Sequence, residues 1–214
     1  MGELNVASLY QESFRKYKEN WLAGILVTLA YAVLYIIPVV GQFVAPLVAA
    51  ALFHYGLLVW SGKTQLSVQE PFSLPGSTYL KVGIVFIGLA LLQLVIMKAY
   101  SSFVSAAYTH GLWFSFSFYS PYLSGMVIGL LAYFFLFSYS FLILEKNAEL
   151  ADAIKISFSL SLNNSGNLII FVLVAWVINL VGALPCGVGL LVTAPTTLIA
   201  SAGLYKKLVG EGSA

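Results

Sequence analysis

Three long stretches without a single charged side chain constrain the fold of this chain more than any other feature. Residues 156–205 contain no Asp, Glu, Lys or Arg over 50 positions, residues 20–62 none over 43, and residues 99–144 none over 46. A helix of about 20 mostly apolar residues crosses the hydrocarbon layer of a bilayer, so each stretch can hold two such helices. Only 8% of the 214 residues are charged, against about 25% in a typical soluble domain. The sequence therefore predicts an integral membrane protein.

The apolar segments predict an all-α fold with six transmembrane helices in a single transmembrane domain covering residues 1–214. A turn with Pro38 and Gly41 joins the first two spans, because Pro ends a helix and Gly lets the chain reverse. A similar turn with Pro185 and Gly189 joins the last two. The six spans are expected at residues 21–40, 42–60, 81–99, 123–144, 167–184 and 190–205.

The basic residues predict the orientation in the membrane. With six spans, the N-terminus, the loop 61–80, the segment 145–166 and the C-terminus share one side, which holds nine of the ten Lys and Arg residues. Only Lys98 lies opposite. Loops rich in Lys and Arg stay in the cytoplasm. We therefore expect a multi-pass protein of the cell (inner, cytoplasmic) membrane with both termini in the cytoplasm.

Residues 101–122 are the ambiguous part of this topology. They are apolar enough for a seventh span, but a seventh span would place Lys146 and the lysines that follow it outside, against the same rule. The segment is also rich in Ser and aromatic residues. We expect a helix or loop at the outer interface, while spanning and re-entrant arrangements stay open.

Aromatic side chains make this connector the most distinctive exposed segment of the chain. Anchoring at the membrane interface is their ordinary role. The alternative is a docking face for another membrane subunit. The candidate contacts for such a partner are Trp113, Phe114, Phe116 and Tyr119.

The two ends of the chain share a pattern that predicts a parallel internal repeat, with residues 7–60 as the first copy and residues 151–208 as the second. Ser13-Phe14 corresponds to Ser157-Phe158, and Asn20 to Asn164. Both copies start on the same side of the membrane, as parallel repeats do. Residues 81–144 form a central hairpin between them. The alternative to a true repeat is a chance similarity, because any two apolar hairpins with Pro-Gly turns have similar sequences. Further paired positions are Pro38 and Pro185, Pro46 and Pro195, and Tyr55 and Tyr205.

Each copy is expected to begin with an amphipathic helix at the inner membrane interface. Apolar residues recur at helical spacing before the first span and again before the fifth. Such helices lie flat on a leaflet, with basic residues near anionic head groups. The apolar stripes consist of Val6, Leu9, Tyr10, Phe14 and Tyr17 in the first copy and of Leu150, Ile154 and Phe158 in the second.

The second copy contains a series of short motifs: Ala151, Ser157-Phe158, Asn164, Leu184-Pro185, Gly189, Pro195 and Gly203-Leu204-Tyr205. In this layout the chain resembles a group of small, multi-pass prokaryotic membrane proteins, many of unknown function. The group includes the membrane domain of some glycerophosphoryl diester phosphodiesterases. The resemblance implies a multi-pass helical fold. It transfers no catalytic residue, because the phosphodiesterase catalytic domain is not among these residues.

Four residues inside the predicted spans are candidates for a solute pathway. Pro46 and Pro195 leave backbone carbonyls free, and a pair of kinks could frame a cavity; both can equally be prolines at helix starts. His54 could titrate or bind a metal, although a lone His is more often a hydrogen-bonded packing residue. Asn179 could line a path or form an ordinary hydrogen bond between helices.

No residue pattern of an enzyme, a metal site, a cofactor site or a nucleic-acid-binding surface is present in the sequence. We therefore expect a non-enzymatic protein without cofactors. The first hypothesis is an accessory or scaffold subunit of a membrane complex. The alternative is a transporter or channel for a neutral or lipid-like solute. The expected partners are the lipid bilayer and either other membrane subunits or further copies of the chain in a homo-oligomer.

Overall fold

The computed structural model describes residues 5–37, 40–109, 120–185 and 187–210, and this part of the chain is helical without any strand. The all-α prediction is confirmed. A short 3-10 helix, η1 (Glu70–Phe72), lies in the loop before α4. The α-helices are α1 (Val6–Glu19), α2 (Trp21–Ile36), α3 (Val40–Trp60), α4 (Gly76–Thr109), α5 (Ser120–Leu136), α6 (Tyr139–Lys146), α7 (Leu150–Asn163), α8 (Ser165–Ala183) and α9 (Leu190–Val209).

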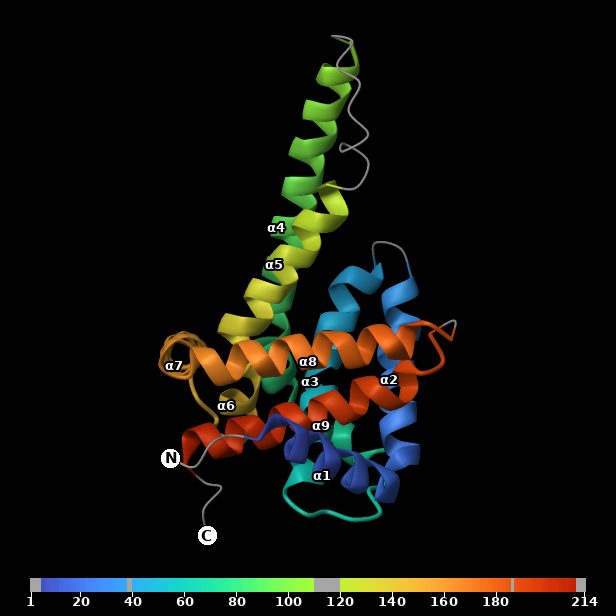
Figure 1. The fold of residues 1–214 in the computed structure, drawn as a ribbon, viewed down its shortest axis with the longest axis vertical. Coiled ribbons are helices and arrows are strands. Elements are labelled where there is room, and N and C mark those ends of the chain that lie inside the picture. The colour runs from blue at the N-terminus through green and yellow to red at the C-terminus, as the bar shows by residue number, and fades with distance from the viewer. Residues whose placement is uncertain (1–4, 38–39, 110–119, 186, 211–214) are drawn as a thin grey trace.

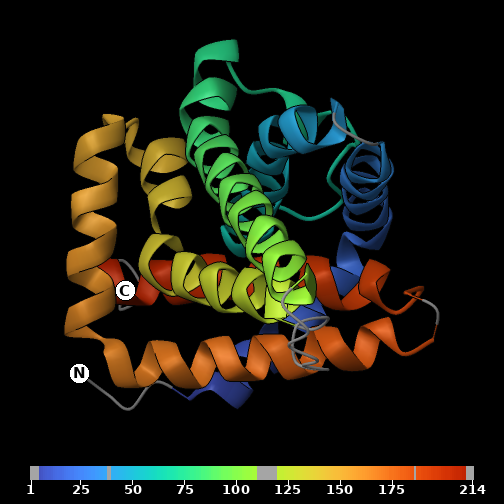
Figure 2. The same cartoon turned by 90° about the horizontal axis from the view of Figure 1, so that it is seen from above.

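The apolar helices do not form one aligned bundle of six. Helices α4 and α5 form an antiparallel pair that projects from the body of the protein (Figure 1). Helices α8 and α9 instead run across the direction of this pair (Figure 1), and in the view from above α4 crosses the molecule obliquely (Figure 2). Helices α2 and α3 form a third hairpin beside α4. The fold is therefore built from three apolar hairpins that cross one another.

Helix α9 lies at the centre of the fold because its small residues let other backbones approach. It packs against α1, α2, α3 and α8, and most of its residues from Pro195 to Tyr205 are buried. A Cβ atom added at Gly56 of α3 would lie 2.8 Å from the carbonyl oxygen of Leu198. A Cβ atom added at Gly203 would lie 2.6 Å from the ring of Trp60. Both glycines thus allow contact distances that a side chain would prevent.

Three helical segments are long and apolar enough to cross a membrane: Gly76–Ala99, Val127–Lys146 and Ser165–Ala183. The apolar side chains of the first and third segments are largely exposed, whereas the second segment buries Phe137, Tyr139 and residues 141–143. On α8 the exposed residues include Ile169, Ile170, Leu173, Trp176 and Val177. A soluble monomer rarely exposes a contiguous apolar surface of this kind. The structure thus supports association with a membrane. Helices α2 and α3 contribute shorter apolar segments, Trp21–Leu34 and Val44–Trp60.

Helix α4 is longer than the predicted third span. It has 34 residues, which makes it about 51 Å long at 1.5 Å per residue. It continues through Thr109, so the first part of the expected interfacial connector extends the helix instead. Residues 110–119 lie outside the described ranges, and with them the candidate partner contacts Trp113, Phe114, Phe116 and Tyr119.

The predicted fourth span, residues 123–144, is interrupted in the structure. Helix α5 ends at Leu136, and α6 begins at Tyr139. Serines of α7 bind the carbonyl groups near this break: Ser157 Oγ donates to Phe135 O at 2.8 Å, and Ser161 Oγ donates to Phe134 O at 2.7 Å. A broken helix in an apolar setting needs such replacement partners for its backbone groups. The hydropathy of the segment does not reveal them.

The two expected amphipathic segments both form helices, α1 and α7, and each has 14 residues. Ser13 and Ser157 are fully buried, whereas Phe14 and Phe158 are exposed. Each helix ends at an Asn with nearly the same backbone angles, φ −128° and ψ 21° at Asn20 and φ −124° and ψ 27° at Asn164. Their packing differs, because α1 contacts α9 while α7 contacts α5 and α6.

Candidate functional site

A row of hydroxyl side chains along α9 forms one polar region of the protein interior. Thr193, Thr197 and Ser201 are spaced by four residues and therefore share one face of the helix. The Thr197 hydroxyl donates to Thr193 O, and the Ser201 hydroxyl donates to Thr197 O, both at 2.8 Å. Tyr133 of α5 shares a hydrogen bond of 2.8 Å with the Ser201 hydroxyl. The row is thus the place where α5 meets α9 through neutral polar groups.

Asn179 joins α8 to the same row. Its Nδ2 donates to Thr197 Oγ1 at 3.0 Å and to Ala175 O at 2.8 Å. Both hydrogens of the side-chain amide are therefore used. The Oδ1 atom is buried without a hydrogen-bond partner in the described structure. The structure thus places Asn179, a candidate from the sequence, in a contact between helices with one acceptor unsatisfied.

Tyr10 of α1 brings a second unsatisfied group to this place. Its ring stacks on Phe171 with centroids 5.7 Å apart, and the residue is only 9% exposed. Burial raises the pKa of its hydroxyl above the ordinary range, neighbouring Tyr133 raises it further, and nearby Thr197 opposes the shift. The hydroxyl is therefore neutral. Thr197 lies nearby, but the Tyr10 hydroxyl makes no hydrogen bond of good geometry with a described residue. A buried polar group left in this state costs about 1–3 kcal/mol.

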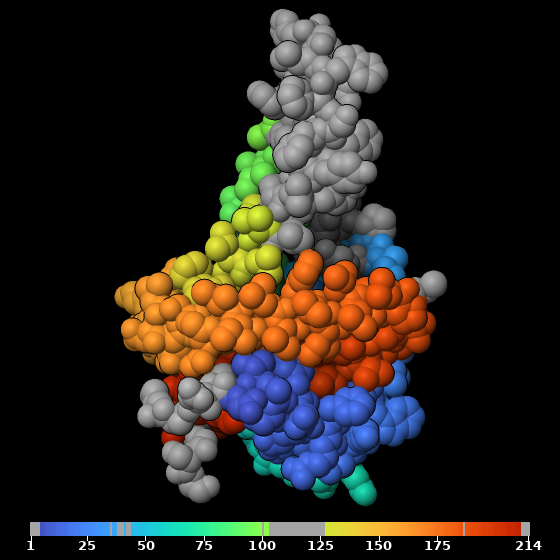
Figure 3. Space-filling model, viewed as in Figure 1, coloured from blue at the N-terminus to red at the C-terminus, as the bar shows by residue number. Residues whose placement is uncertain are grey.

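A cavity of about 310 Å³, here called the inter-hairpin cavity, lies between α1 and the α8–α9 hairpin. Helix α8 lies directly above α1 on this face of the molecule (Figure 3). None of the lining side chains is ionisable except Tyr10, which burial keeps neutral. The lining residues are Tyr10, Gln11, Phe14, Ile178, Val192, Thr193 and Thr196.

Two further cavities have different surroundings. One of about 220 Å³ lies among α2, α3, α4 and α5, and Pro46 and Gln93 are among its lining residues. The other, of about 280 Å³, lies between α5 and α8 and is lined only by Leu, Ile, Val and Phe. Pro46 is thus buried beside a cavity. Pro195 is buried in α9 but is not among the lining residues of these three cavities.

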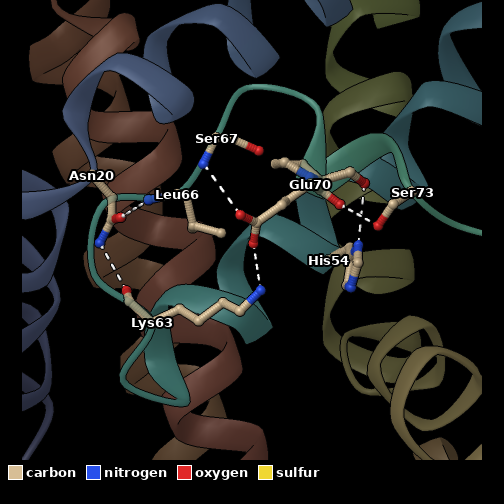
Figure 4. Close-up of polar contacts among 8 residues, drawn as sticks. Asn20, His54, Lys63, Leu66, Ser67, Glu70 and Ser73 are labelled. Atoms are coloured by element: carbon tan, nitrogen blue, oxygen red, sulfur yellow. Dashed lines mark hydrogen bonds and ion pairs between the residues drawn. The ribbon is translucent and has the colours of Figure 1, made fainter.

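His54 contacts the loop between α3 and α4, whose polar contacts are shown in Figure 4. Its Nδ1 lies 3.2 Å from Pro71 O. A carbonyl oxygen can only accept, so Nδ1 carries the proton in this contact. The arrangement is that of a structural histidine. No group of three or more His, Cys, Asp or Glu that could hold a metal occurs among the described residues.

Asn20 anchors the same loop from the opposite side (Figure 4). Its Nδ2 donates to Lys63 O at 3.1 Å, and its Oδ1 accepts from Leu66 N at 2.9 Å. An ion pair between Lys63 and Glu70 closes the loop. These contacts, here called the loop clasp, fasten the connection between the first and second hairpins.

Sequence reasoning did not single out Tyr10 or Thr193. Tyr10 lies in the apolar stripe of α1, where an aromatic residue fits the helical pattern without any further role. The spacing of Thr193, Thr197 and Ser201 along one helix face is the one signal in the sequence that indicates the polar row. Which residues face it across the helix contact depends on packing that the sequence does not show.

Comparison with protein-family models, with curated proteins and with solved structures finds no match to the chain. The resemblance to the membrane domain of glycerophosphoryl diester phosphodiesterases thus receives no support from these comparisons and stays a prediction. The inter-hairpin cavity and the polar groups beside it are therefore the features of the molecule that indicate a function.

Proposed function

We propose that this protein binds a neutral, lipid-like molecule within the bilayer, as a non-enzymatic carrier or transporter. The observation that carries the proposal is the inter-hairpin cavity, with its mostly apolar walls and the buried, unpartnered Tyr10 hydroxyl. The sequence placed an accessory subunit slightly ahead of such a role. The inter-hairpin cavity favours the alternative hypothesis, a protein that binds or transports a lipid-like solute.

The size and lining of the cavity suit a small hydrophobic ligand. Ligand pockets commonly measure about 300–1,000 Å³. This one is open to the surface, since Phe14 and Val192 in its lining are 43% and 37% exposed. The cavity's volume of about 310 Å³ therefore fits a ligand of roughly ten heavy atoms, or one end of a larger lipid. Its wall offers no fixed charge to neutralise an ionic ligand.

The proposed setting is the cytoplasmic membrane, with three hairpins entering from the cytoplasmic side. A hairpin begins and ends on the same side, so the basic loops stay together whether or not each hairpin crosses completely. The ion pairs Lys81–Glu149 and Lys63–Glu70 both lie on this side. We further propose that α1–α3 and α7–α9 are parallel repeats. The inter-hairpin cavity then lies between the copies, where transporters commonly bind their substrates.

The test is native mass spectrometry of the protein gently extracted from its own membrane. We expect a bound, uncharged lipid-like molecule at a fixed ratio to the chain. Val192→Phe, which fills the cavity, should remove it, whereas the matched control Ile170→Phe on the exposed face of α8 should retain it. Absence of any bound molecule, or equal retention by both variants, would reject the proposal.

The second candidate function is an accessory subunit that docks through the α4–α5 pair. Only 11% of the apolar segment of α4 is buried. Exposed residues on it include Leu91, Leu92, Leu94 and Val95. The same mass spectrum tests this function, because a stoichiometric protein partner without bound lipid would favour it over the carrier.

A further inference from the structure

We infer that the outer face of α8 binds the acyl chains of a single leaflet, and that this helix lies along the membrane instead of crossing it. The partner of the surface is thus one lipid layer, on the side of the membrane where α4 begins and α5 ends. The inference goes beyond the proposed function, because it holds whether or not the inter-hairpin cavity contains a ligand. Both proposed repeats still start on the same side, since a hairpin in the membrane plane also begins and ends there.

Helix α8 has one face that packs on protein and one face that is uncovered. The first face is buried because the helix packs against α1, α5, α7 and α9. The second face carries no charged residue and runs the whole length of the helix, since its members recur at helical spacing. A long apolar surface of this kind is costly in water and favourable against lipid chains. The spaced members are Ile169, Leu173, Trp176, Leu180 and the C-cap residue Leu184, each between 43% and 76% exposed.

Helix α4 is exposed in a different way. Only 11% of its apolar segment is buried, against 28% of that of α8. Leu91, Leu92, Leu94 and Met97 are all exposed, and at about 100° per residue they are spread around most of the helix. A helix with this surface is surrounded by lipid, as a spanning helix is, whereas α8 meets lipid on one side only.

The directions of the two helices do not allow both of them to cross the bilayer. The α4–α5 pair projects from the body of the protein, and α8 runs across this direction at the base of the projection (Figure 1). Spanning helices tilt by about 20° on average and by at most about 40° from the bilayer normal. Because α4 has the surface of a spanning helix, α4 follows the normal and α8 lies in the plane.

The order of the helices along this direction supports the same placement. On the face shown in Figure 3, the α4–α5 pair projects on one side of α8, and α1 lies on the other side. Helix α8 carries no charge, whereas Arg15, Lys18 and Glu19 of α1 are charged and exposed. The change from an apolar helix to a charged one matches the change from acyl chains to head groups, where basic side chains are favoured.

The experiment measures the depth of single cysteines in the full-length protein in phosphatidylcholine liposomes. Each variant is made in a Cys186→Ser background and labelled with a nitroxide. Its depth follows from collisions with oxygen, which is concentrated in the hydrocarbon layer, and with a nickel complex, which stays in water. The series on α8 consists of Ile169→Cys, Leu173→Cys, Trp176→Cys, Leu180→Cys and Leu184→Cys. The matched control series on α4 has the same spacing and consists of Leu80→Cys, Ile84→Cys, Ile87→Cys, Leu91→Cys and Val95→Cys.

The two series should give different depth profiles. Each series extends over about 22 Å of helix at 1.5 Å per residue, so a helix that crosses the bilayer gives depths that differ by at least about 10 Å. We expect this range for α4. On α8 the five depths should agree within about 5 Å. The α8 positions are exposed, so these substitutions leave the packing of the helix intact.

Three results would overturn the inference. If the depths on α8 vary as those on α4 do, with the deepest position near Trp176, then α8 crosses the bilayer. If the labels on α8 collide with the nickel complex as readily as a label in water, this face does not contact lipid. If the depths on α4 are constant as well, the assignment of the spanning helix is wrong. Each of these results leaves the ligand of the inter-hairpin cavity to the mass spectrum, so the inference and the proposed function fail separately.

Discussion

At the scale of single residues, Asn20 shows how one buried amide connects distant parts of the chain. It is 4% exposed, and its side chain bonds Lys16 O, Lys63 O and Leu66 N. Among the described residues, the side chain of Asn164, its counterpart at the end of α7, donates to Leu160 O alone. Two residues with similar backbone angles thus have different energetic roles, because only one of them faces a loop.

The first prediction follows from this contrast. Asn20→Ala should lower the free energy of unfolding by about 1–3 kcal/mol, because it removes two part-buried hydrogen bonds, to Lys63 O and from Leu66 N, each worth about 0.5–1.5 kcal/mol. Asn164→Ala should cost less, about 0.5–1.5 kcal/mol, for the loss of one hydrogen bond. Thermal unfolding in detergent, followed by tryptophan fluorescence, measures both. If Asn164→Ala lowers the free energy of unfolding more than Asn20→Ala does, the loop clasp does not stabilise the fold as proposed.

The second prediction concerns the pH dependence of the clasp. Hydrogen bonding to Lys63 lowers the pKa of Glu70 below its ordinary value of 4.5. A carboxyl whose folded pKa is depressed stabilises the fold above its unfolded pKa, and this contribution disappears as pH falls through the folded value. The wild type should therefore be more stable than Glu70→Gln at pH 6 to 7.

The same comparison at low pH supplies the control. The difference in unfolding temperature between the wild type and Glu70→Gln should shrink progressively below about pH 4.5. Because the pair is exposed, the effect should also weaken with added salt. A difference that stays constant from pH 7 to pH 3 would show that the carboxylate charge does not contribute.

At the scale of helices, the contact between α3 and α9 depends on the absence of a side chain at Gly56. A Cβ atom there would meet the Leu198 backbone at 2.8 Å, and a backbone cannot move aside as a flexible side chain does. Gly88 in α4 is also helical, but a Cβ atom at this position would meet nothing within 4 Å. The two glycines thus form a matched pair.

The third prediction is that Gly56→Ala and Gly88→Ala have opposite signs. Gly56→Ala should destabilise the protein by about 1–3 kcal/mol through overpacking. Gly88→Ala should be neutral or stabilise it by up to about 1 kcal/mol, because Ala favours the helix. The unfolding midpoints of the two purified variants, each compared with that of the wild type, test this prediction. Equal effects would mean that α3 and α9 are not in close backbone contact.

Helix α5 illustrates a different interaction between elements. Residues 123–144 contain no charge and no internal Pro, so hydropathy alone predicts one continuous span. The break at 137–138 is accommodated because Ser138, Ser157 and Ser161 form hydrogen bonds at the contact with α7. Ser157 and Ser161 lie 19 or more positions after Ser138 in the sequence. A local sequence pattern therefore does not connect them to α5.

At the scale of the whole molecule, ion pairs join helices that lie far apart in the sequence. Lys206 of α9 pairs with Glu145, and Lys81 of α4 pairs with Glu149. The first pair joins α9 to the end of α6, and the second joins the first turns of α4 to the residue before α7. The start of α4 lies at the base from which α4 and α5 project (Figure 1). Lys98 lies more than halfway along α4, away from this base.

The fourth prediction tests the orientation with cysteine labelling in intact cells. In a Cys186→Ser background, Lys98→Cys should react with a membrane-impermeant maleimide from outside. Lys63→Cys and Glu149→Cys should react only after the cells are opened, because the basic side is expected in the cytoplasm. External labelling of Lys63→Cys together with protection of Lys98→Cys would show the opposite orientation.

The sequence by itself determined the all-α class of this protein and the approximate location of most of its helices, but not the break between α5 and α6 or the full length of α4. Long uncharged stretches predict apolar helices, and the stripes before them predict the amphipathic helices α1 and α7, because both signals are local and periodic. The turns between α2 and α3 and between α8 and α9 follow from Pro and Gly for the same reason. The candidates Pro46, His54 and Asn179 were recognisable as unusual residues in apolar helices.

Tertiary structure alone decided how the hairpins cross and which residues meet. An apolar helix has little preference for one neighbour over another, so the packing of α9 against α3 depends on the close contacts at Gly56 and Gly203. The same packing brings Tyr10 of α1 beside Thr197 of α9, and it turns His54 toward the loop instead of a pathway. The inter-hairpin cavity exists only because these distant segments meet, and no local pattern in the sequence encodes that contact.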